Sequence, residues 1–288
     1  MKFTRNFSEY AEMIKLGHTL FALPYALAGF LLAYFSGFGF SPSKLFWIVL
    51  AFFGARSAAM GFNRIADAKF DAENPRTKNR SIPAGRIAKS SALLFVAFSA
   101  VAMLFSARML NELCFWLAFP ALTVLFGYSY CKRFTNLCHF VLGFALSLAP
   151  AGAWCAASGK FSFSIIFISL ALLFQIAAFD ILYALQDEEF DKSEKLHSIP
   201  ASFGRKKSIM ASAVMLLLSI VFLYLTGAAF SLGKIFYTIS AAILALYVLA
   251  VLIFIKSGIK KIDLVFFYIN ALCSFLTLAA VALGGFFK

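Results

Sequence analysis

Nine apolar runs in the chain are each about long enough to cross the hydrocarbon core of a bilayer, which takes about 20 helical residues. Unpaired backbone groups are costly in lipid, so such runs form helices or a closed barrel, and continuous rather than alternating apolar runs select helices. The predicted transmembrane helices are 18–35, 45–62, 90–107, 113–130, 137–158, 161–182, 209–232, 235–255 and 264–287. We therefore expect an all-α, polytopic protein in which residues 1–288 form a single membrane domain.

Composition excludes a soluble protein. The chain is 62% hydrophobic and 14% charged, whereas soluble chains are about half apolar and about a quarter charged. Its net charge of +13 would suit either nucleic acid or an anionic membrane surface. Because long soluble segments are lacking, we expect the lipid bilayer as a partner and no nucleic acid. The five cysteines form no C-x-x-C pair and mostly lie in apolar runs, where thiols pack as small hydrophobes.

Basic residues predict the orientation. Of the 26 Lys and Arg residues, 20 fall in the N-terminus and the even-numbered loops, and five fall on the opposite side. Cytoplasmic loops carry such an excess. We expect an inner (plasma) membrane protein with a cytoplasmic N-terminus and an external C-terminus.

Two loops on the cytoplasmic side, at about 63–89 and 187–208, are longer than the other connections. The segment Ser-Ile-Pro-Ala at 81–84 recurs at 198–201. Acidic pairs with a spacing of four recur as well, as Asp67 and Asp71 in the first loop and as Asp187 and Asp191 in the second. The repeat predicts two related halves of about four helices each around a central cavity.

The acidic pairs predict a metal site. Asn63, Asp67 and Asp71 recur every fourth position, which on a helix places their oxygen atoms along one face. Asp187 and Asp191 repeat that spacing. Carboxylates at this density repel one another unless a cation lies among them, and hard oxygen ligands in a partial shell suit Mg²⁺ together with phosphate oxygens. The expected substrate therefore carries phosphates.

Basic side chains lie among these carboxylates, and they suit the outer oxygens of a diphosphate leaving group. Arg64 and Arg80 belong to the first loop, and Lys132 and Arg133 to the loop between the two acidic loops. The alternative for many of the basic residues is that they are solvated loop ends that follow the positive-inside rule.

Arg56 is a charged residue inside a predicted span, which normally faces a cavity or a partner. It precedes Asn63 by seven residues, so both lie on one helix face. We expect it to meet an anionic or carbonyl group of a second substrate. The alternative is a structural ion pair with Asp180.

Three motifs resemble those of the UbiA superfamily of intramembrane aromatic prenyltransferases. In chain order they are Asn63-x-x-x-Asp67-x-x-x-Asp71 followed by Asn74-Pro75-Arg76-Thr77 and Arg80, Tyr130-x-Lys132-Arg133-Phe134-Thr135, and Tyr183-Ala184-x-x-Asp187-x-x-x-Asp191. Nine helices with two Asp-rich cytoplasmic loops are also that family's layout, so the resemblance covers essentially the whole chain.

The resemblance implies Mg²⁺ binding at Asn63, Asp67, Asp71, Asp187 and Asp191, and diphosphate contacts at Lys132 and Arg133, to which Arg64 and Arg80 are added from the first loop. It implies that a polyprenyl diphosphate ionises and that an aromatic ring attacks the cation. Arg56, Asp180 and Tyr183 are the expected residues for the aromatic acceptor. Asp180 is also a candidate for the base that removes the ring proton, with a purely structural role as the alternative.

Segments 13–24 and 55–64 resemble the 4-hydroxybenzoate polyprenyltransferase-like branch, which includes menaquinone-pathway members. Gly17 stands where that branch often has an acidic residue. The implied acceptor is 4-hydroxybenzoate or a related hydroxynaphthoate in quinone biosynthesis. His18 and His139 are interpreted as helix-end residues and His197 as a loop residue.

Two other classes also use carboxylates in membrane helices. An ion-coupled secondary transporter is the main alternative, but its sites favour the bilayer midplane, whereas these Asp residues lie at predicted helix ends. A phosphatidyl-group transferase would carry a D-G-x-x-A-R signature, which this sequence lacks.

Overall fold

The computed structural model describes residues 2–288, except for the side chains of residues 2–7, 16, 18 and 20. The predicted helix-end position of the His18 side chain and the N-terminal cations Lys2 and Arg5 thus lie outside the described side chains. All regular structure in the described chain is helical, as predicted. The chain forms two compact units, the first comprising Met1–Thr19 and Phe46–Tyr130 and the second Leu20–Leu45 and Cys131–Lys288.

Eight described helices are long and apolar enough to cross a membrane. The ninth predicted span, at 18–35, is shorter. It consists of a 3-10 helix at Leu16–Phe21, helix α2 at Leu23–Ala33, and a π-helical turn at Tyr34–Phe38. Pro24 lies in the first turn of α2, where its missing N–H removes no helical hydrogen bond. The polytopic all-α class is confirmed: in the described chain, eight of the nine predicted spans correspond to long helices and one corresponds to a shorter apolar helix.

Unit 1 is built on helix α3, of which the part from Phe46 to the helix end belongs to this unit. Its helices are α1 (Lys2–Met13), α3 (Pro42–Ala66), α4 (Ala68–Glu73), α5 (Lys89–Leu110) and α6 (Glu112–Gly127). Helices α3 and α5 cross closely at Gly54, where a Cβ atom would lie 2.9 Å from the backbone of Ser99 and Met103. The rings of Phe62 and Phe126, 4.7 Å apart, pack α3 against α6.

A small apolar core anchors the first acidic loop within unit 1. Its buried members are Met13, Ile14, Ala68, Ile82, Ile87 and Ala92. They come from the end of α1, from α4, from the loop itself and from the start of α5. The loop is therefore held by packing on both sides, although it lies between two membrane helices.

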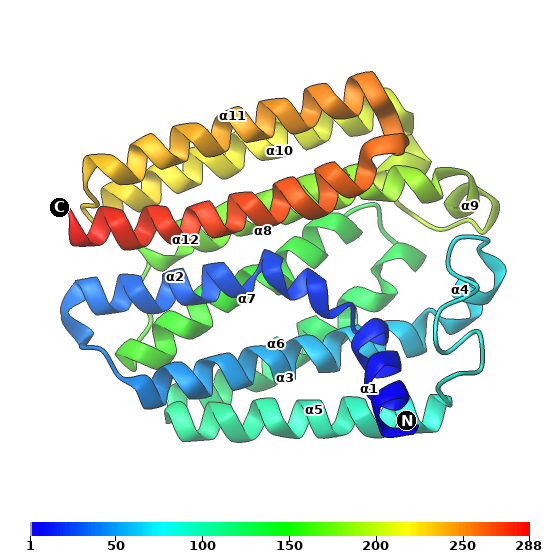
Figure 1. The fold of residues 1–288 in the computed structure, drawn as a ribbon, viewed down its shortest axis with the longest axis horizontal. Coiled ribbons are helices and arrows are strands. Elements are labelled where there is room, and N and C mark those ends of the chain that lie inside the picture. The colour runs from blue at the N-terminus through cyan, green and yellow to red at the C-terminus, as the bar shows by residue number, and fades with distance from the viewer. Residues whose placement is uncertain (1) are drawn as a thin grey trace. The chain divides into compact units, whose positions relative to one another are not determined.

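Unit 2 is centred on helix α8, which packs against α7 and α10 and lies at the middle of the unit (Figure 1). Besides α2, its helices are α7 (Cys138–Ser158), α8 (Ile165–Ala184), α9 (Glu188–Ser193), α10 (Ile199–Ala229), α11 (Lys234–Ser257) and α12 (Asn270–Phe286). At Gly143 of α7 a Cβ atom would lie 2.5 Å from the carbonyl oxygen of Leu173 on α8. Only a glycine permits this approach.

One glutamine links the helices of unit 2. Gln175 on α8 is fully buried, and its Oε1 accepts hydrogen bonds of 2.7 Å from Tyr25 on α2 and from Tyr247 on α11. Its Nε2 donates to Asn270 Oδ1 at 2.8 Å and to Ser274 Oγ at 3.0 Å on α12. Buried amides require such partners, since an unmade hydrogen bond costs about 1–3 kcal/mol.

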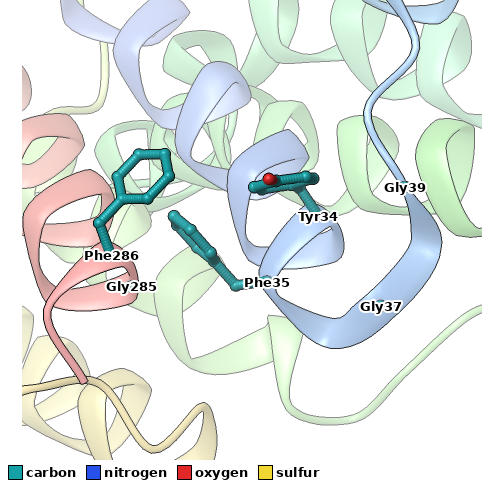
Figure 2. Close-up of a pocket in the computed structure, with 6 residues that line it drawn as sticks. All are labelled: Tyr34, Phe35, Gly37, Gly39, Gly285 and Phe286. Carbon is teal, nitrogen blue, oxygen red and sulfur yellow. The ribbon is translucent and has the colours of Figure 1, made fainter.

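The end of α12 and the π-helical turn after α2 line a shallow, open pocket of about 420 Å³ (Figure 2). It is lined by Tyr34, Phe35, Gly37, Gly39, Gly285 and Phe286. The rings of Phe35 and Phe286 meet edge to face at 5.0 Å. Gly285 lies where the Phe35 ring leaves no room for a Cβ atom.

The structure adds two features to the predicted layout. The compact units are unequal in size: unit 1 holds three long helices, and unit 2 holds five together with α2. Parts of the two acidic loops are helical. Helix α4 lies in the first loop, and in the second α9 is followed by the start of α10, which bends at Gly204 with φ 74°.

Candidate functional site

The first acidic motif lies at the junction of α3 and α4 in unit 1. Helix α3 ends at Ala66 and α4 begins at Ala68, so the motif is not on one continuous helix as expected. Its backbone nevertheless keeps the helical connections, with Asp67 N donating to Asn63 O at 2.9 Å and Asp71 N to Asp67 O at 2.8 Å. The amide of Asn63 also donates to Asp67 Oδ2 at 2.8 Å. The structure brings Asn63 and Asp67 together as the spacing predicted.

Asp71 is buried and bound to the loop that follows it. Arg80 Nη1 lies 2.6 Å from Asp71 Oδ1, and Arg64 Nη1 lies 3.9 Å from Asp71 Oδ2. The hydroxyl of Thr77 donates to the Asp71 carbonyl oxygen at 3.0 Å. Asp71 Oδ2 has no hydrogen-bond partner in the described structure although it is buried. A buried carboxylate oxygen without a hydrogen bond is a suitable ligand for a cation.

Arg64 ties this motif to the N-terminal segment of the same unit. It is buried, and its Nε donates to the Met13 carbonyl oxygen at 3.3 Å. Burial and the charge of Arg64 lower the pKa of the nearby Lys15 from its usual value. Lys15 belongs to the α1–α2 connection with φ 49°, and sequence spacing gave no reason to include it with the first acidic loop.

The second acidic motif in unit 2 has the same local backbone as the first. Asp67 precedes the six-residue helix α4 with φ −92° and ψ 4°, and Asp187 precedes the six-residue helix α9 with φ −105° and ψ 9°. In each motif the second aspartate, Asp71 or Asp191, lies inside the short helix and is buried. The predicted repeat of the two loops thus extends from sequence to backbone conformation.

Asp191 also has a basic partner. Lys132 Nζ lies 3.2 Å from Asp191 Oδ2. The chain after the motif returns to the same place, because His197 N donates to the Lys132 carbonyl oxygen at 2.6 Å and Leu196 N donates to the Asp191 carbonyl oxygen at 2.8 Å. His197 therefore acts through its backbone, in agreement with its interpretation as a loop residue. The neighbouring Arg133 side chain is exposed.

Arg56 lies on α3, seven residues before Asn63. Its Nε atom is buried and has no hydrogen-bond partner among the described residues. A half-buried guanidinium whose buried Nε donor has no partner favours an anionic ligand, since leaving such a donor unpaired is costly.

Asp180 is paired within unit 2, on the helix that leads to the second motif. His139 Nδ1 lies 2.6 Å from Asp180 Oδ2, and the other ring nitrogen of His139 accepts a hydrogen bond from Ile199 N at 3.4 Å. His139 is at a helix end as expected, but it is fully buried and joins three segments, α7, α8 and the start of α10. The sequence gave no signal for this pair, whose members are 41 residues apart.

Tyr183, one turn before Asp187, packs against an aromatic residue that the sequence analysis did not single out. The ring centroids of Tyr183 and Phe266 are 4.2 Å apart, and the Phe21 ring meets Phe266 edge to face at 5.4 Å. Phe266 belongs to the π-helical segment Leu264–Ile269. Such segments occur frequently at functional sites, and this one brings an aromatic ring beside the second motif.

The oxygen-bearing side chains of the first motif are of the types that bind Mg²⁺. Within the described residues no three His, Cys, Asp or Glu side chains form a complete metal cluster. Magnesium commonly takes one or two carboxylates and fills its remaining positions with water and substrate phosphate oxygens. The first motif offers two carboxylates and the amide of Asn63, with one buried carboxylate oxygen that has no hydrogen bond. These residues therefore fit Mg²⁺ in the presence of a phosphorylated substrate.

Comparison with known proteins identifies the family. The model of the UbiA prenyltransferase family matches residues 22–272. A 4-hydroxybenzoate octaprenyltransferase from Vibrio campbellii (strain ATCC BAA-1116) is 31% identical over 198 residues, which are 68% of this chain and 69% of the relative. Another 4-hydroxybenzoate octaprenyltransferase, from Neisseria gonorrhoeae (strain ATCC 700825 / FA 1090), is 33% identical over 150 residues, 52% of this chain and 51% of that protein.

Solved structures share the fold. An apo structure of a UbiA homolog from Aeropyrum pernix K1 has a TM-score of 0.83 and 28% identity, and the match covers 92% of this chain and 97% of that chain. A UbiA homolog from Archaeoglobus fulgidus bound to DMAPP and Mg²⁺ has a TM-score of 0.70 at 21% identity, with 95% and 99% coverage. The chain belongs to the UbiA prenyltransferase family, in its 4-hydroxybenzoate polyprenyltransferase-like branch.

Proposed function

We propose that this protein transfers a polyprenyl group from a polyprenyl diphosphate to an aromatic acid, with Mg²⁺, in quinone biosynthesis. The observation that carries the proposal is the repeated acidic turn. Each of the two motifs places one aspartate before a short helix and a second, buried aspartate beside a basic side chain. Two such turns suit a substrate with two phosphates, whose charge needs both metal ligands and cations.

Asn63, Asp67, Asp71, Asp187 and Asp191 are the proposed metal ligands. When bound, Mg²⁺ would neutralise the negative charge that develops on the leaving diphosphate. Arg64, Arg80, Lys132 and Arg133 would bind the diphosphate oxygens. Arg80 and Lys132 already lie against Asp71 and Asp191, so each cation is held at its motif before substrate arrives.

The reaction follows from these roles. The allylic C–O bond breaks and its electron pair leaves with the diphosphate. The resulting allylic cation accepts electrons from the aromatic ring, a C–C bond forms, and the ring loses a proton. A water-poor site protects the cation from hydrolysis.

The proposed acceptor site includes Arg56, Tyr183 and Asp180. The unpaired Nε of Arg56 suits the carboxylate of 4-hydroxybenzoate or of a related hydroxynaphthoate. The alternative for Arg56 was an ion pair with Asp180. His139 already binds the Asp180 carboxylate, which disfavours that ion pair. That bond also supports a structural role for Asp180 over the role of base for the ring proton.

Residues 1–288 would form one catalytic domain in the inner (plasma) membrane with the N-terminus and both acidic loops in the cytoplasm. The excess of Lys and Arg on the N-terminus and even-numbered loops supports this orientation. Membership of a prenyltransferase family favours the enzyme over the ion-coupled transporter.

The test is prenyl transfer by detergent-purified protein, given a polyprenyl diphosphate with either 4-hydroxybenzoate or dihydroxynaphthoate. We expect product with Mg²⁺ and none with EDTA, and the preferred acceptor identifies the pathway branch. Asp67→Ala and Asp187→Ala should both abolish product. If folded wild-type protein made no product with either acceptor, ion-driven uptake in liposomes would become the next assay.

A further inference from the structure

Six basic residues gather at one end of the α10–α11 helix pair in unit 2. Three belong to α10, one to α11, and two to the 3-10 helix Gly258–Lys261 that follows it. These residues, which we call the basic end, are Arg205, Lys206, Lys207, Lys256, Lys260 and Lys261. All six are exposed.

The two helices bring these residues together because they pack side by side in antiparallel directions (Figure 1). The guanidinium of Arg205 lies over the ring of Phe254 at 5.9 Å. A Cβ atom at Gly258 would lie 2.7 Å from Arg205 Nη2, so Arg205 of α10 sits directly on the turn that ends α11. The backbone at position 258 has φ 59°, a conformation that also favours glycine there.

The charge of the basic end is not balanced within the protein. None of the six cations forms an ion pair with a carboxylate of the described chain, and Asp263 is the one acidic residue within the segment 256–263. Arg205, Lys206 and Lys207 also occupy the first turn after the bend at Gly204, where the helix dipole disfavours positive charge. Helix stability thus gives no reason for their placement.

Two lysines at the opposite end of unit 2, Lys44 and Lys160, also have contacts within the protein. Lys44 Nζ donates to the Ala157 carbonyl oxygen at 2.7 Å, and Lys160 lies over the Phe38 ring at 5.1 Å. The positive-inside rule explains the sign of the charge at the basic end. It does not require six cations without a carboxylate partner on one helix pair.

Apolar side chains that are exposed surround the basic end. They are Phe203, Ile255, Ile259, Leu264 and Tyr268. Lys207 additionally lies over the Phe203 ring at 5.9 Å. Cations beside exposed aliphatic and aromatic side chains match the boundary between lipid headgroups and acyl chains, where Lys and Arg extend toward the headgroups.

We propose that the basic end binds anionic phospholipid headgroups, with the phosphates at its cations and the acyl chains against the exposed apolar side chains. A juxtamembrane Lys or Arg attracts anionic lipid by about 1 kcal/mol, which corresponds to about fivefold in affinity. The proposal does not depend on the catalytic reaction, and its test uses lipid retention alone.

The experiment is native mass spectrometry of the full-length protein in detergent, mixed with equal amounts of dioleoylphosphatidylglycerol and dioleoylphosphatidylcholine. We expect the wild-type protein to retain phosphatidylglycerol in preference. The double variant Lys206→Gln/Lys207→Gln should lower the phosphatidylglycerol to phosphatidylcholine ratio by about 25-fold, from two factors of about five. Higher ionic strength should also lower the phosphatidylglycerol to phosphatidylcholine ratio of the wild type, because salt screens exposed charges.

The charge-matched control is Lys234→Gln/Lys288→Gln, which removes two cations from the opposite end of unit 2. It should keep the wild-type ratio within about twofold. Lys260→Gln/Lys261→Gln provides a second test if the first double variant does not fold. Equal loss in the control and test variants would overturn the proposal, as would a wild-type protein without preference, the result expected if the basic end binds an acidic protein.

Discussion

Arg80 Nη1 and Asp71 Oδ1 lie 2.6 Å apart at the first acidic motif, while the other oxygen of the Asp71 carboxylate is buried and without a hydrogen bond. One oxygen is thus held directly by Arg80, while the other faces Arg64 Nη1 at 3.9 Å without a hydrogen bond and can accept a ligand. This division gives the two residues separate roles, which variants can distinguish.

Asp71→Asn should lower kcat at least about a hundredfold, because the amide cannot supply the charge of a metal ligand and metals contribute several kcal/mol to such reactions. Arg80→Gln should mainly raise the KM of the prenyl diphosphate. Steady-state kinetics across a range of prenyl diphosphate and Mg²⁺ concentrations measures both. If saturating prenyl diphosphate restored Arg80→Gln but left Asp71→Asn inactive, the division of roles would hold; wild-type kcat in Asp71→Asn would contradict it.

Arg56→Leu should raise the KM of the aromatic acid by about tenfold or more and change the KM of the prenyl diphosphate by less than about twofold. The physical reason is the loss of a charge-assisted hydrogen bond to the acceptor carboxylate alone. Arg56→Lys keeps the charge, and its KM for the aromatic acid should lie between those of the wild type and Arg56→Leu. Equal increases in both KM values would show that Arg56 does not recognise the acceptor.

His139→Ala should lower the free energy of unfolding by about 2 kcal/mol, since hydrogen bonds to charged groups contribute about 1.5–3 kcal/mol. Thermal unfolding in detergent measures the change. Asp180→Asn keeps an oxygen acceptor for His139 and is the paired variant. A structural role for Asp180 predicts a lower Tm with kcat reduced less than about tenfold. An unchanged Tm with a hundredfold lower kcat would instead identify Asp180 as the base.

Gln175→Leu should destabilise unit 2 by about 2–3 kcal/mol, because it leaves the buried hydroxyls of Tyr25 and Tyr247 without their acceptor. Ser240→Ala is a suitable control: Ser240 is equally buried, but its hydroxyl bonds only to Phe236 within the same helix. We expect that control to remain within about 0.5 kcal/mol of wild type. A similar Tm loss in both variants would mean that the links between helices contribute little.

Gly143→Ala should destabilise the packing of α7 on α8 by about 1–3 kcal/mol, the usual cost of overpacking. The new methyl group would lie 2.5 Å from the Leu173 carbonyl oxygen, which is backbone and cannot rotate away. Gly152→Ala on the same helix meets nothing within 4 Å and should leave Tm unchanged or raised. If both variants had the same unchanged or raised Tm, helix propensity rather than packing would govern these positions.

The sequence was sufficient for the features that depend on local spacing. Long apolar runs predicted the helices of the membrane domain, and the four-residue spacing of acidic residues predicted their turns, because both patterns follow from helix geometry. The interruption between Ala66 and Ala68 leaves the spacing intact, since the hydrogen bonds from Asp67 to Asn63 and from Asp71 to Asp67 persist across it.

Features that depend on tertiary packing could not be predicted. The pairing of His139 with Asp180 joins two helices, and nothing in the neighbouring residues of either one indicates the other. Phe266 reaches Tyr183 from a π-helical segment, whose additional residue per turn has no clear pattern in an apolar run. The unequal units follow from which helices pack together, which hydropathy does not encode.

Helix α2 has consequences for biosynthesis. Its 11 residues span about 16 Å, about half of the hydrocarbon core, and the 3-10 and π-helical segments at its ends leave a less regular backbone that is tolerated at membrane depth only under cover of protein. That cover comes from α7, α8 and α12, all of which are synthesised later. Helix α2 therefore gains this cover only once those later helices are in the membrane, so its final packing is a late, post-insertion step.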